Sequence, residues 1–453
     1  MFSLDKVPFW YLQASTLNCI GLLHSGSNSG KEAALRNFGE LVYMARSEKL
    51  VYDPNGPDTA SYGGSTQTTW EYWTEKEGRR RLGYLLWLLD CTFSYEFDAR
   101  EHMSLNECQA PLPAAENIWE AESEQSWLTL YENSSELESL YTATQTMYIE
   151  KRISPGIGEF SQILLIHALQ RRTREVASYF NDPLSSWTPT AKKQQRDSAL
   201  GHETPWLPSH PIYAKWRNSA CDCLDILHWT ANETIARAAG SEHPTVLHLH
   251  LARIVLLVPV LELRELSKSL IQGTITWTER HNTSSWHCIT RWVKHDQFKA
   301  RLAVIHAGSV LWHIRRYSAK TFHEPIAVFL ATLTLWAYGS CPGATIMTTS
   351  NNNNNNPQQH QPNPLIPLHQ PTFVHLDRPC DDELIQLFVR EGHRMKGNMT
   401  GVGDICDQYG PEKVLREGAR ILSDLTVWGI SRSFGTMLTG LADRVSCDNA
   451  VRA

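Results

Sequence analysis

Apolar residues recur along most of this chain with the three- to four-residue spacing of an α-helix, which predicts a protein built from helices. No stretch alternates apolar and polar positions as a half-buried strand does, and no strand–helix–strand rhythm appears. The expected fold class is all-α, a large multi-helical domain. Helices are expected over 8–24, 31–49, 70–97, 122–146, 159–180, 212–238, 242–271, 286–318 and 322–339.

Helical signals return near the C-terminus. Asp381 is expected to cap a helix that carries the apolar residues of 384–388, because an aspartate can accept a hydrogen bond from a free N–H in the first turn. Pro411 suits the first turn of another helix, whose apolar stripe runs from Val414 to Trp428.

Two polar stretches separate these helical parts. Residues 182–211 are rich in proline, serine, threonine and charge, and 342–376 contain six consecutive asparagines followed by prolines and glutamines. Neither stretch can bury enough apolar surface to offset the entropy lost on ordering, so both are expected to be disordered inserts. The expected organisation is a helical domain over 1–341 with flexible loops 52–68 and 182–211, a low-complexity linker 342–376, and C-terminal helices 377–453 that pack on the same domain.

The segment from Leu82 to Phe93 is apolar on every side of a helix except at Asp90, and arginines precede it. A helix without a polar face belongs in the middle of a large core. A carboxylate buried there needs a cation or several donors, so Asp90 is expected to pair with an arginine. We favour a structural ion pair over a catalytic carboxylate.

Composition narrows the class of protein. The 453 residues include 42 % hydrophobic and 20 % charged residues, which excludes wholesale disorder. Forty-two basic against 48 acidic residues give a formal net charge of −6, the wrong sign for a chain whose main task is to neutralise phosphates. Arg171-Arg172 and Arg315-Arg316 are accordingly expected to pair with carboxylates or to face solvent.

The sequence gives no sign of membrane insertion or secretion. The N-terminus lacks a basic leader followed by an apolar core, and the longest apolar runs fall short of the roughly 20 residues that span a bilayer. Ten cysteines without paired spacing suit reduced thiols inside a cell.

Candidate chemistry is weak throughout. A two-Cys-two-His zinc finger needs a Cys pair and a His pair at defined spacings, and none is present. Cys221 and Cys223 lie two positions apart, as do His248 and His250, so each pair points in nearly opposite directions around its helix and cannot easily hold one metal ion. No nucleophile elbow or metalloprotease helix is found. The sequence predicts no catalytic residue, no metal ligand and no cofactor.

Several segments spread over the chain nevertheless form a recognisable set. They are Glu77, Arg80, Arg81, Asp90, Leu112, Pro113 and Trp119 in the first third, 311–317 with Glu324, Pro325 and Trp336 further on, and Asp381, Asp382, Glu383, 401–404 and 427–431 near the end. Together they resemble the fungal-specific transcription factor regulatory region, or middle homology region, in the variant carried by two-Cys-two-His zinc-finger regulators.

The resemblance implies a multi-helical regulatory domain that controls RNA polymerase II transcription in a fungal nucleus and is not an enzyme. In the family this region follows zinc-binding DNA-recognition modules, so zinc is implied only for fingers that these residues do not contain. The expected partners are transcription co-regulators or a finger-bearing relative, as a homodimer or heterodimer. DNA would be reached only through modules outside the chain, and no membrane is expected. Two alternatives stay open: a finger-less paralogue that acts as an adaptor or dominant-negative partner, and an all-helical enzyme.

Overall fold

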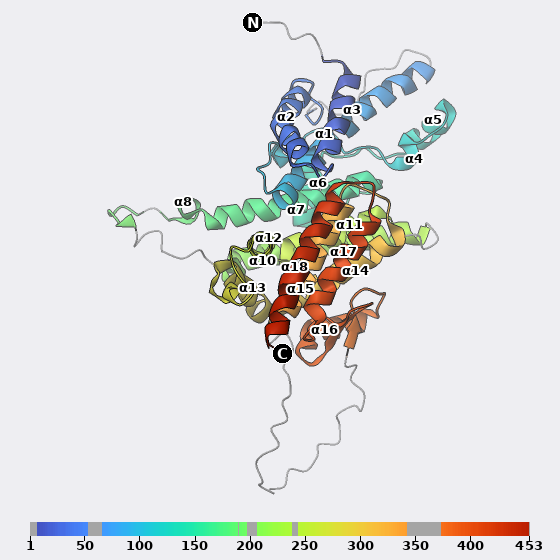
Figure 1. The fold of residues 1–453 in the computed structure, drawn as a ribbon. Helices are drawn as coiled ribbons and strands as arrows, with labels where there is room; N and C mark the ends of the chain where they lie inside the picture. The colour runs from blue at the N-terminus through green and yellow to red at the C-terminus, as the bar shows by residue number, and fades with distance from the viewer. Residues whose placement is uncertain are drawn as a thin grey trace, which may run out of the picture. The chain divides into compact units, whose positions relative to one another are not determined.

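The computed structural model describes residues 7–52, 66–188, 190–196, 206–237, 243–341 and 373–452, and these residues are mostly helical (Figure 1). They contain 17 α-helices and three short strands, which confirms the all-α fold class. The chain divides into two compact units. Unit 1 comprises residues 1–256, 317–324 and 426–431, and unit 2 comprises 257–316, 325–425 and 432–453.

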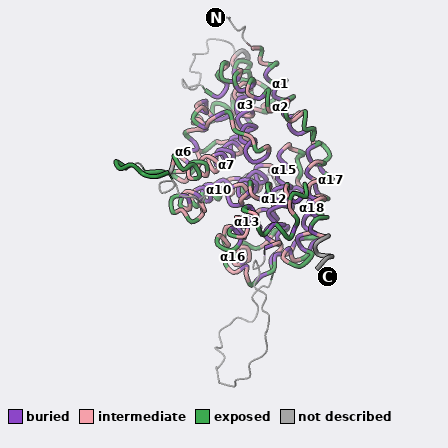
Figure 2. The backbone as a smooth tube through the Cα atoms, turned by 60° about the vertical axis from the view of Figure 1, so that its left-hand side comes forward, coloured by how far each residue is buried: buried purple, intermediate pink, exposed green. Residues whose placement is uncertain are grey.

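Unit 1 is built around long helices that enclose buried apolar faces. Its helices are α1 (Phe9–Leu23), α2 (Asn28–Ser47), α3 (Thr66–Thr92), α4 (Glu116–Trp119), α5 (Glu124–Glu132), α6 (Leu140–Glu150), α7 (Glu159–Asn181), α8 (Pro183–Ser186), α10 (Pro211–Arg237) and α11 (Pro244–Leu257). Short helical turns lie at η1 (Phe93–Phe97), η2 (Leu105–Glu107) and η3 (Leu207–Ser209). The segment after α7 is exposed, as the green tube in Figure 2 shows.

The central helix of unit 1 is α3. From Leu82 to Thr92 almost every side chain is buried, and Trp87 and Leu89 are completely inaccessible to solvent. The helix then widens into the π-type turn η1, and Asp98 ends it in the left-handed region, with φ 53°. The prediction that this apolar segment lies in the core is confirmed.

Unit 2 combines helices with a small three-stranded sheet. Its elements are α12 (Val260–Gln272), η4 (Glu279–Asn282), α13 (Ser284–His295), α14 (Gln297–Tyr317), α15 (Glu324–Gly339), β1 (Phe373–His375), α16 (Asp382–Glu391), η5 (Gly392–Arg394), β2 (Lys396–Met399), β3 (Gly403–Asp404), α17 (Gly410–Asp424) and α18 (Ile430–Arg452). Strand β2 pairs in parallel with β1, with Val374 opposite Gly397, and antiparallel with β3. Helix α15 is buried on all sides from Ile326 to Tyr338.

Three segments that were each expected to form one helix form two helices in the structure. The expected helix 122–146 is interrupted at 133–139, where Ser139 caps α6 by accepting from the backbone N–H of Thr142. The expected helix 242–271 breaks before Pro259, because proline lacks an N–H and disfavours helical geometry in the preceding residue. The expected helix 286–318 breaks at Asp296, which ends α13.

The C-terminal prediction is wrong in part. Helix α17 ends at Asp424, so Trp428 does not continue its stripe, and α18 was not expected. The three short strands were not expected either, because two to four residues are too few to show alternation.

The expected flexible stretches overlap with ordered elements. Strand β1 falls inside 342–376, while 342–372 lie outside the described residues. Likewise α3 already begins at Thr66, within the expected loop 52–68, whose residues 53–65 lie outside the described part. Helices α8 and η3 occupy parts of 182–211, of which 189 and 197–205 are not described.

Gly308 shows why a small residue is needed in α14. A Cβ atom at this position would lie 2.1 Å from the backbone carbonyl oxygen of Leu376 in the segment that follows β1. Because that neighbour is backbone, it cannot rotate away. We expect Gly308→Ala to lower the free energy of unfolding by about 1–3 kcal/mol, measured by urea denaturation of the full chain.

The control for this variant is Gly435→Ala in α18, where the nearest atoms to an added Cβ are 3.9 Å away. There the methyl group has room and restricts the unfolded chain, so stability should be unchanged or slightly raised. Equal losses in the two variants would contradict the close approach at Gly308.

Across the described residues, no single helix is both long and apolar enough to cross a membrane; only the interrupted pair α11 and α12 meets that standard, and only when the two helices are counted together.

Candidate functional site

The middle of α3 carries a cluster of charged side chains that bond to one another. The Glu77 carboxylate is only 1 % exposed, and it accepts hydrogen bonds from Arg80 at 2.7 Å and from Nε of Arg81 at 3.1 Å. It also accepts one from the backbone N–H of Ala114 at 2.9 Å, while Arg81 donates to the Ala114 carbonyl at 2.6 Å. Glu77 and Arg81 thus fix the backbone of the segment that follows Pro113 against α3.

The Leu112-Pro113 pair lies within this arrangement. The Leu112 side chain is fully buried, and its N–H donates to the Glu138 carbonyl at 2.9 Å. The Pro113 carbonyl accepts from the hydroxyl of Ser161 on α7 at 2.9 Å. The Arg81 guanidinium lies over the ring of Trp119, with its Cζ atom 4.9 Å from the ring centre. These contacts join α3, α4 and α7.

Glu116 connects the same cluster to the first turn of α7. Its carboxylate accepts from the backbone N–H groups of Glu159 at 2.7 Å and of Phe160 at 3.0 Å. A carboxylate at a helix N-terminus satisfies donors that the helix leaves free. Burial, together with the neighbouring Glu159 carboxyl group, raises the pKa of Glu116 to about 7.

This raised pKa predicts a pH dependence of stability. A carboxyl group whose pKa is higher in the folded than in the unfolded state holds its proton more tightly when folded, so stability falls as pH rises from about 4.5 to about 7. We expect Glu159→Gln to lower the pKa of Glu116 and to raise the melting temperature relative to the parent at pH 8, with the difference shrinking toward pH 5. A difference that stays constant with pH would show that the two carboxyl groups do not interact.

Asp90 lies in the core of unit 1 and has the arginine partner that its burial requires. The carboxylate has no exposed surface; it pairs with Arg171 of α7 at 3.1 Å and accepts from the backbone N–H groups of His102 and Met103, each at 2.8 Å. The predicted buried ion pair is confirmed. Arg315 is likewise a carboxylate partner, since it pairs with Asp377 and with Glu417.

The remaining residues of the sequence set stabilise local structure in separate places. Glu324 begins α15 and accepts from Ser318 at 2.6 Å and from the N–H of Ala319 at 2.8 Å, which closes the turn before the helix. Pro325 lies in the first turn of α15, and Trp336 is fully buried in unit 2. Asp381 caps α16 as predicted, with Asp382 and Glu383 in the favourable first turn. The structure therefore does not gather the set into one site.

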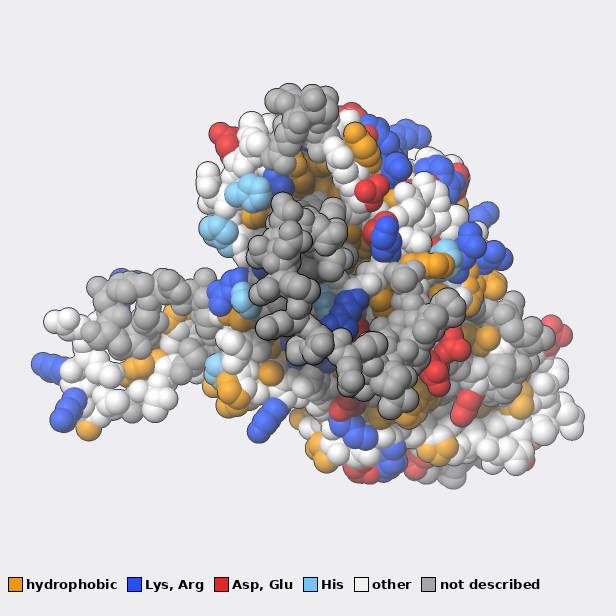
Figure 3. Space-filling view, turned by 90° about the horizontal axis from the view of Figure 1, so that it is seen from below, with side chains coloured by type: hydrophobic (Ala, Val, Ile, Leu, Met, Phe, Trp, Pro, Cys, Tyr) orange, Lys and Arg blue, Asp and Glu red, His pale blue; other side chains and the backbone are white. Residues whose placement is uncertain are grey.

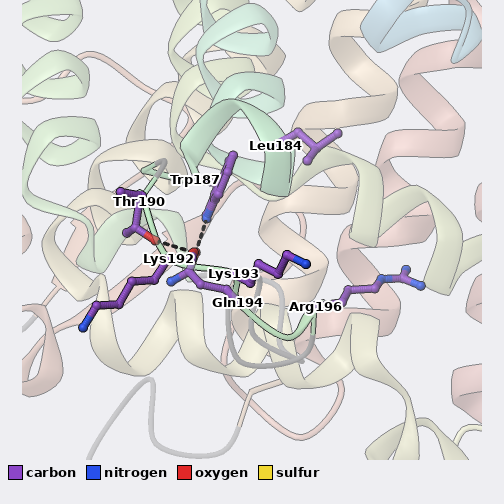
Figure 4. Close-up of a pocket in the computed structure, with 8 residues that line it drawn as sticks. Leu184, Trp187, Thr190, Lys192, Lys193, Gln194 and Arg196 are labelled. Atoms are coloured by element: carbon purple, nitrogen blue, oxygen red, sulfur yellow. Dashed lines mark hydrogen bonds between the residues drawn. The ribbon is translucent and has the colours of Figure 1, made fainter.

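A surface hollow of about 450 Å³ lies on the exposed segment after α7 (Figure 4). Trp187 points toward Gln194, which accepts from its indole N–H at 3.2 Å, and Lys192, Lys193 and Arg196 make the lining basic. Figure 3 shows Lys and Arg side chains gathered on this projecting segment. No carboxylate, histidine or cysteine is among the residues that line the hollow.

A cluster of three buried histidines in unit 1 is the one group among the described residues with the geometry of metal ligands. His167 comes from α7, His248 from α11 and His323 from the turn before α15. Nε2 of His167 lies 3.0 Å from Nδ1 of His248, and one potential ligand atom from each ring lies within 4.8 Å of the others. Burial lowers the pKa of His167 and of His323 well below the ordinary value, and the neighbouring imidazoles add to this effect.

A fourth histidine nearby has the opposite electrostatic environment. His24, the residue that follows α1, pairs with Glu96 of η1 at 3.3 Å, and both side chains are completely buried. Although burial opposes it, the Glu96 carboxylate raises the pKa of His24. The ring of Phe322 contacts both His24 and His323, with ring centres 4.9 Å and 4.0 Å away, respectively.

Sequence reasoning missed this cluster because it tested only neighbours along one helix. His248 and His250 do not converge, as predicted, but His248 meets two histidines that lie 81 and 75 positions away in the sequence. No spacing rule covers such distances. Nine of the ten cysteines are identified as free thiols, in line with the absence of paired spacing.

Comparison with known proteins identifies the N-terminal part of the chain. Residues 2–197 match the family model of the fungal specific transcription factor domain. This match contains α3, the Glu77 cluster, Asp90 and the first of the three clustered histidines. No solved structure matches the chain.

Curated relatives extend the similarity beyond that domain. A "Transcription factor" of Gibberella fujikuroi is 21 % identical over 430 residues, which cover 92 % of this chain and 47 % of the relative. The "Nicotinate catabolism cluster-specific transcription factor" of Emericella nidulans is 24 % identical over 366 residues, which cover 76 % of this chain and 40 % of the relative. The "Zinc finger protein klf1" of Schizosaccharomyces pombe is 19 % identical over 302 residues, which cover 65 % of this chain and 35 % of the relative. The chain thus spans less than half the length of these relatives.

Proposed function

Residues 2–197 belong to the fungal specific transcription factor domain family, and from this premise we propose that the chain is the regulatory domain of a fungal RNA polymerase II transcription factor. The observation that carries the proposal is the family match, extended by relatives named as transcription factors over most of the chain. The domain acts in the nucleus and is not an enzyme. DNA recognition belongs to modules outside these 453 residues.

The charge of the chain favours regulation through protein contacts. With a net charge of −6, the overall charge of the chain disfavours binding to a phosphate backbone. Large side chains nevertheless reach the surface of unit 1: Trp10 and Leu17 of α1 and Trp229 of α10 are each more than 60 % exposed. Exposed aromatic side chains of this kind are enriched at protein interfaces.

The direct test is to fuse residues 1–453 to an unrelated DNA-binding domain and to measure a reporter in both an activation and a repression assay. The fusion should change reporter output several-fold. The exposed variant Asp222→Ala should behave like the parent, whereas Asp90→Ala should lose the effect because it removes a buried ion pair. Unchanged output in both assays, with the fusion present at normal abundance, would refute a regulatory domain.

The second candidate is an adaptor that pairs with a finger-bearing relative and inhibits it. The observation that favours it is the similarity to a relative named as a zinc finger protein. Co-precipitation of the tagged chain with a finger-bearing relative from the same cells tests it. Recovery of the relative, together with reduced reporter output from the relative's own promoter, supports the adaptor; no recovery leaves the first proposal in place.

A further inference from the structure

Three histidines meet in the interior of unit 1 although the sequence separates them widely. His167, His248 and His323 are 0 %, 4 % and 3 % exposed, respectively. They come from α7, from α11 and from the turn 318–323, whose conformation Glu324 fixes through its bonds to Ser318 and Ala319. Histidine is only intermediate in its tendency to be buried, so three histidines at one buried point require a specific reason.

The positions of the ring nitrogens suit a metal ion. Zinc binds imidazole nitrogen at about 2.0–2.1 Å, so two such ligands in a tetrahedral site lie about 3.3 Å apart. Nε2 of His167 and Nδ1 of His248 are already 3.0 Å apart, and one nitrogen of His323 lies within 4.8 Å of both. A tetrahedral zinc site requires the His323 nitrogen to lie about 3.3 Å from each of the other two nitrogens.

A hydrogen-bonded group of neutral histidines is the competing explanation, and it leaves polar atoms unsatisfied. One bond can join His167 to His248, but Nδ1 of His167 and Nε2 of His323 have no hydrogen-bond partner among the described residues. Buried polar groups are normally paired, and each exception calls for an explanation such as a bound ion.

The chemistry of the donors favours one class of ion. All three donors are imidazoles, and the group includes no carboxylate or thiol. Neutral imidazole suits zinc and other late first-row transition metals better than calcium or magnesium, which prefer oxygen ligands. Three histidines with a fourth position left open also form a known zinc geometry.

We propose that His167, His248 and His323 together bind one zinc ion, which ties α7, α11 and the turn before α15 into one rigid core. Each imidazole stays neutral on binding, and only the position of its ring proton changes, so no net proton is released. Metal occupancy stabilises unit 1 by mass action, because the unfolded chain does not bring the three residues together. This site is independent of the proposed role in transcription.

The test uses the full chain, stripped of metal with a chelator and titrated with Zn²⁺ in competition with a colorimetric zinc indicator. The parent should bind one equivalent, and Zn²⁺ should raise its melting temperature. Co²⁺ should give the visible absorption bands of a four-coordinate site. Because the sequence contains no zinc-finger pattern, one bound equivalent cannot be attributed to a finger.

Two variants show whether zinc binds at the cluster or at other histidines of the chain. His248→Gln removes a ligand and should weaken zinc binding by at least about 100-fold, more than the usual effect of changing a group behind the ligands. His250→Gln changes another buried histidine two positions along the same helix, outside the cluster, and should stay within about threefold of the parent. If His248→Gln proves unfolded by circular dichroism, His323→Gln provides the same comparison outside a helix.

The outcomes are distinct. Stoichiometric binding by the parent and His250→Gln, lost in His248→Gln and His323→Gln, supports the site. No stoichiometric binding by the parent at micromolar zinc, or equal affinities in the cluster variants and in His250→Gln, overturns it. Either result leaves the reporter test of the transcriptional role unaffected, since that test does not depend on metal content.

Discussion

Replacing Asp90 with alanine should lower the free energy of unfolding by about 3–5 kcal/mol, because it leaves the Arg171 guanidinium buried without its main partner. The Arg171 side chain is only 7 % exposed, so water cannot replace the carboxylate without rearrangement. Two backbone donors, the N–H groups of His102 and Met103, lose their acceptor at the same time. Urea denaturation of the full chain, followed by fluorescence and circular dichroism, measures the loss.

Two companion variants show whether the charge itself is responsible. Asp222→Ala removes an exposed aspartate from α10 in the same unit and should change stability by less than about 0.5 kcal/mol. The double variant Asp90→Leu with Arg171→Met removes both charges and should cost clearly less than the sum of the two single changes. Strict additivity would show that the two side chains do not interact in the folded protein.

Truncating Trp336 to alanine should lower the free energy of unfolding by a similar amount, about 3–5 kcal/mol. Trp336 lies in the fully buried helix α15 and has no exposed surface. Its ring packs 5.8 Å from that of Trp277, which is itself only 3.5 Å from the Arg280 guanidinium. The substitution leaves a cavity that this tightly packed region cannot close, and thermal and urea unfolding both report its cost.

The matched variants for this prediction are Trp336→Phe and Phe298→Ala. The indole N–H of Trp336 has no hydrogen-bond partner among the described residues, so Trp336→Phe removes side-chain volume but no hydrogen bond. It should lower the free energy of unfolding by well under half as much as Trp336→Ala. Phe298 is 52 % exposed in the same unit, and its truncation should be nearly neutral. A large cost for Trp336→Phe would point to a missing partner for the indole instead.

The sequence predicted those features of the fold that depend on residues close to one another along the chain. The helical periodicity located α1, α2, α3 and α7 to within a few residues, and Asp381 identified the start of α16. The charge pattern at Asp90 predicted an arginine partner, because burying a lone carboxylate is too costly. Even so, periodicity could not place the break at Asp296, since both halves continue the same apolar stripe.

The sequence by itself determined the helical fold class, the buried position of α3 and the need for a cation at Asp90, because each follows from short-range spacing or from the cost of burying charge. Only the tertiary structure decided which arginine pairs with Asp90 and which residues of β1 pair with β2. It also decided that His167, His248 and His323 lie together. Those contacts join residues that lie tens of positions apart, and their formation depends on how helices pack, which no spacing along the chain records.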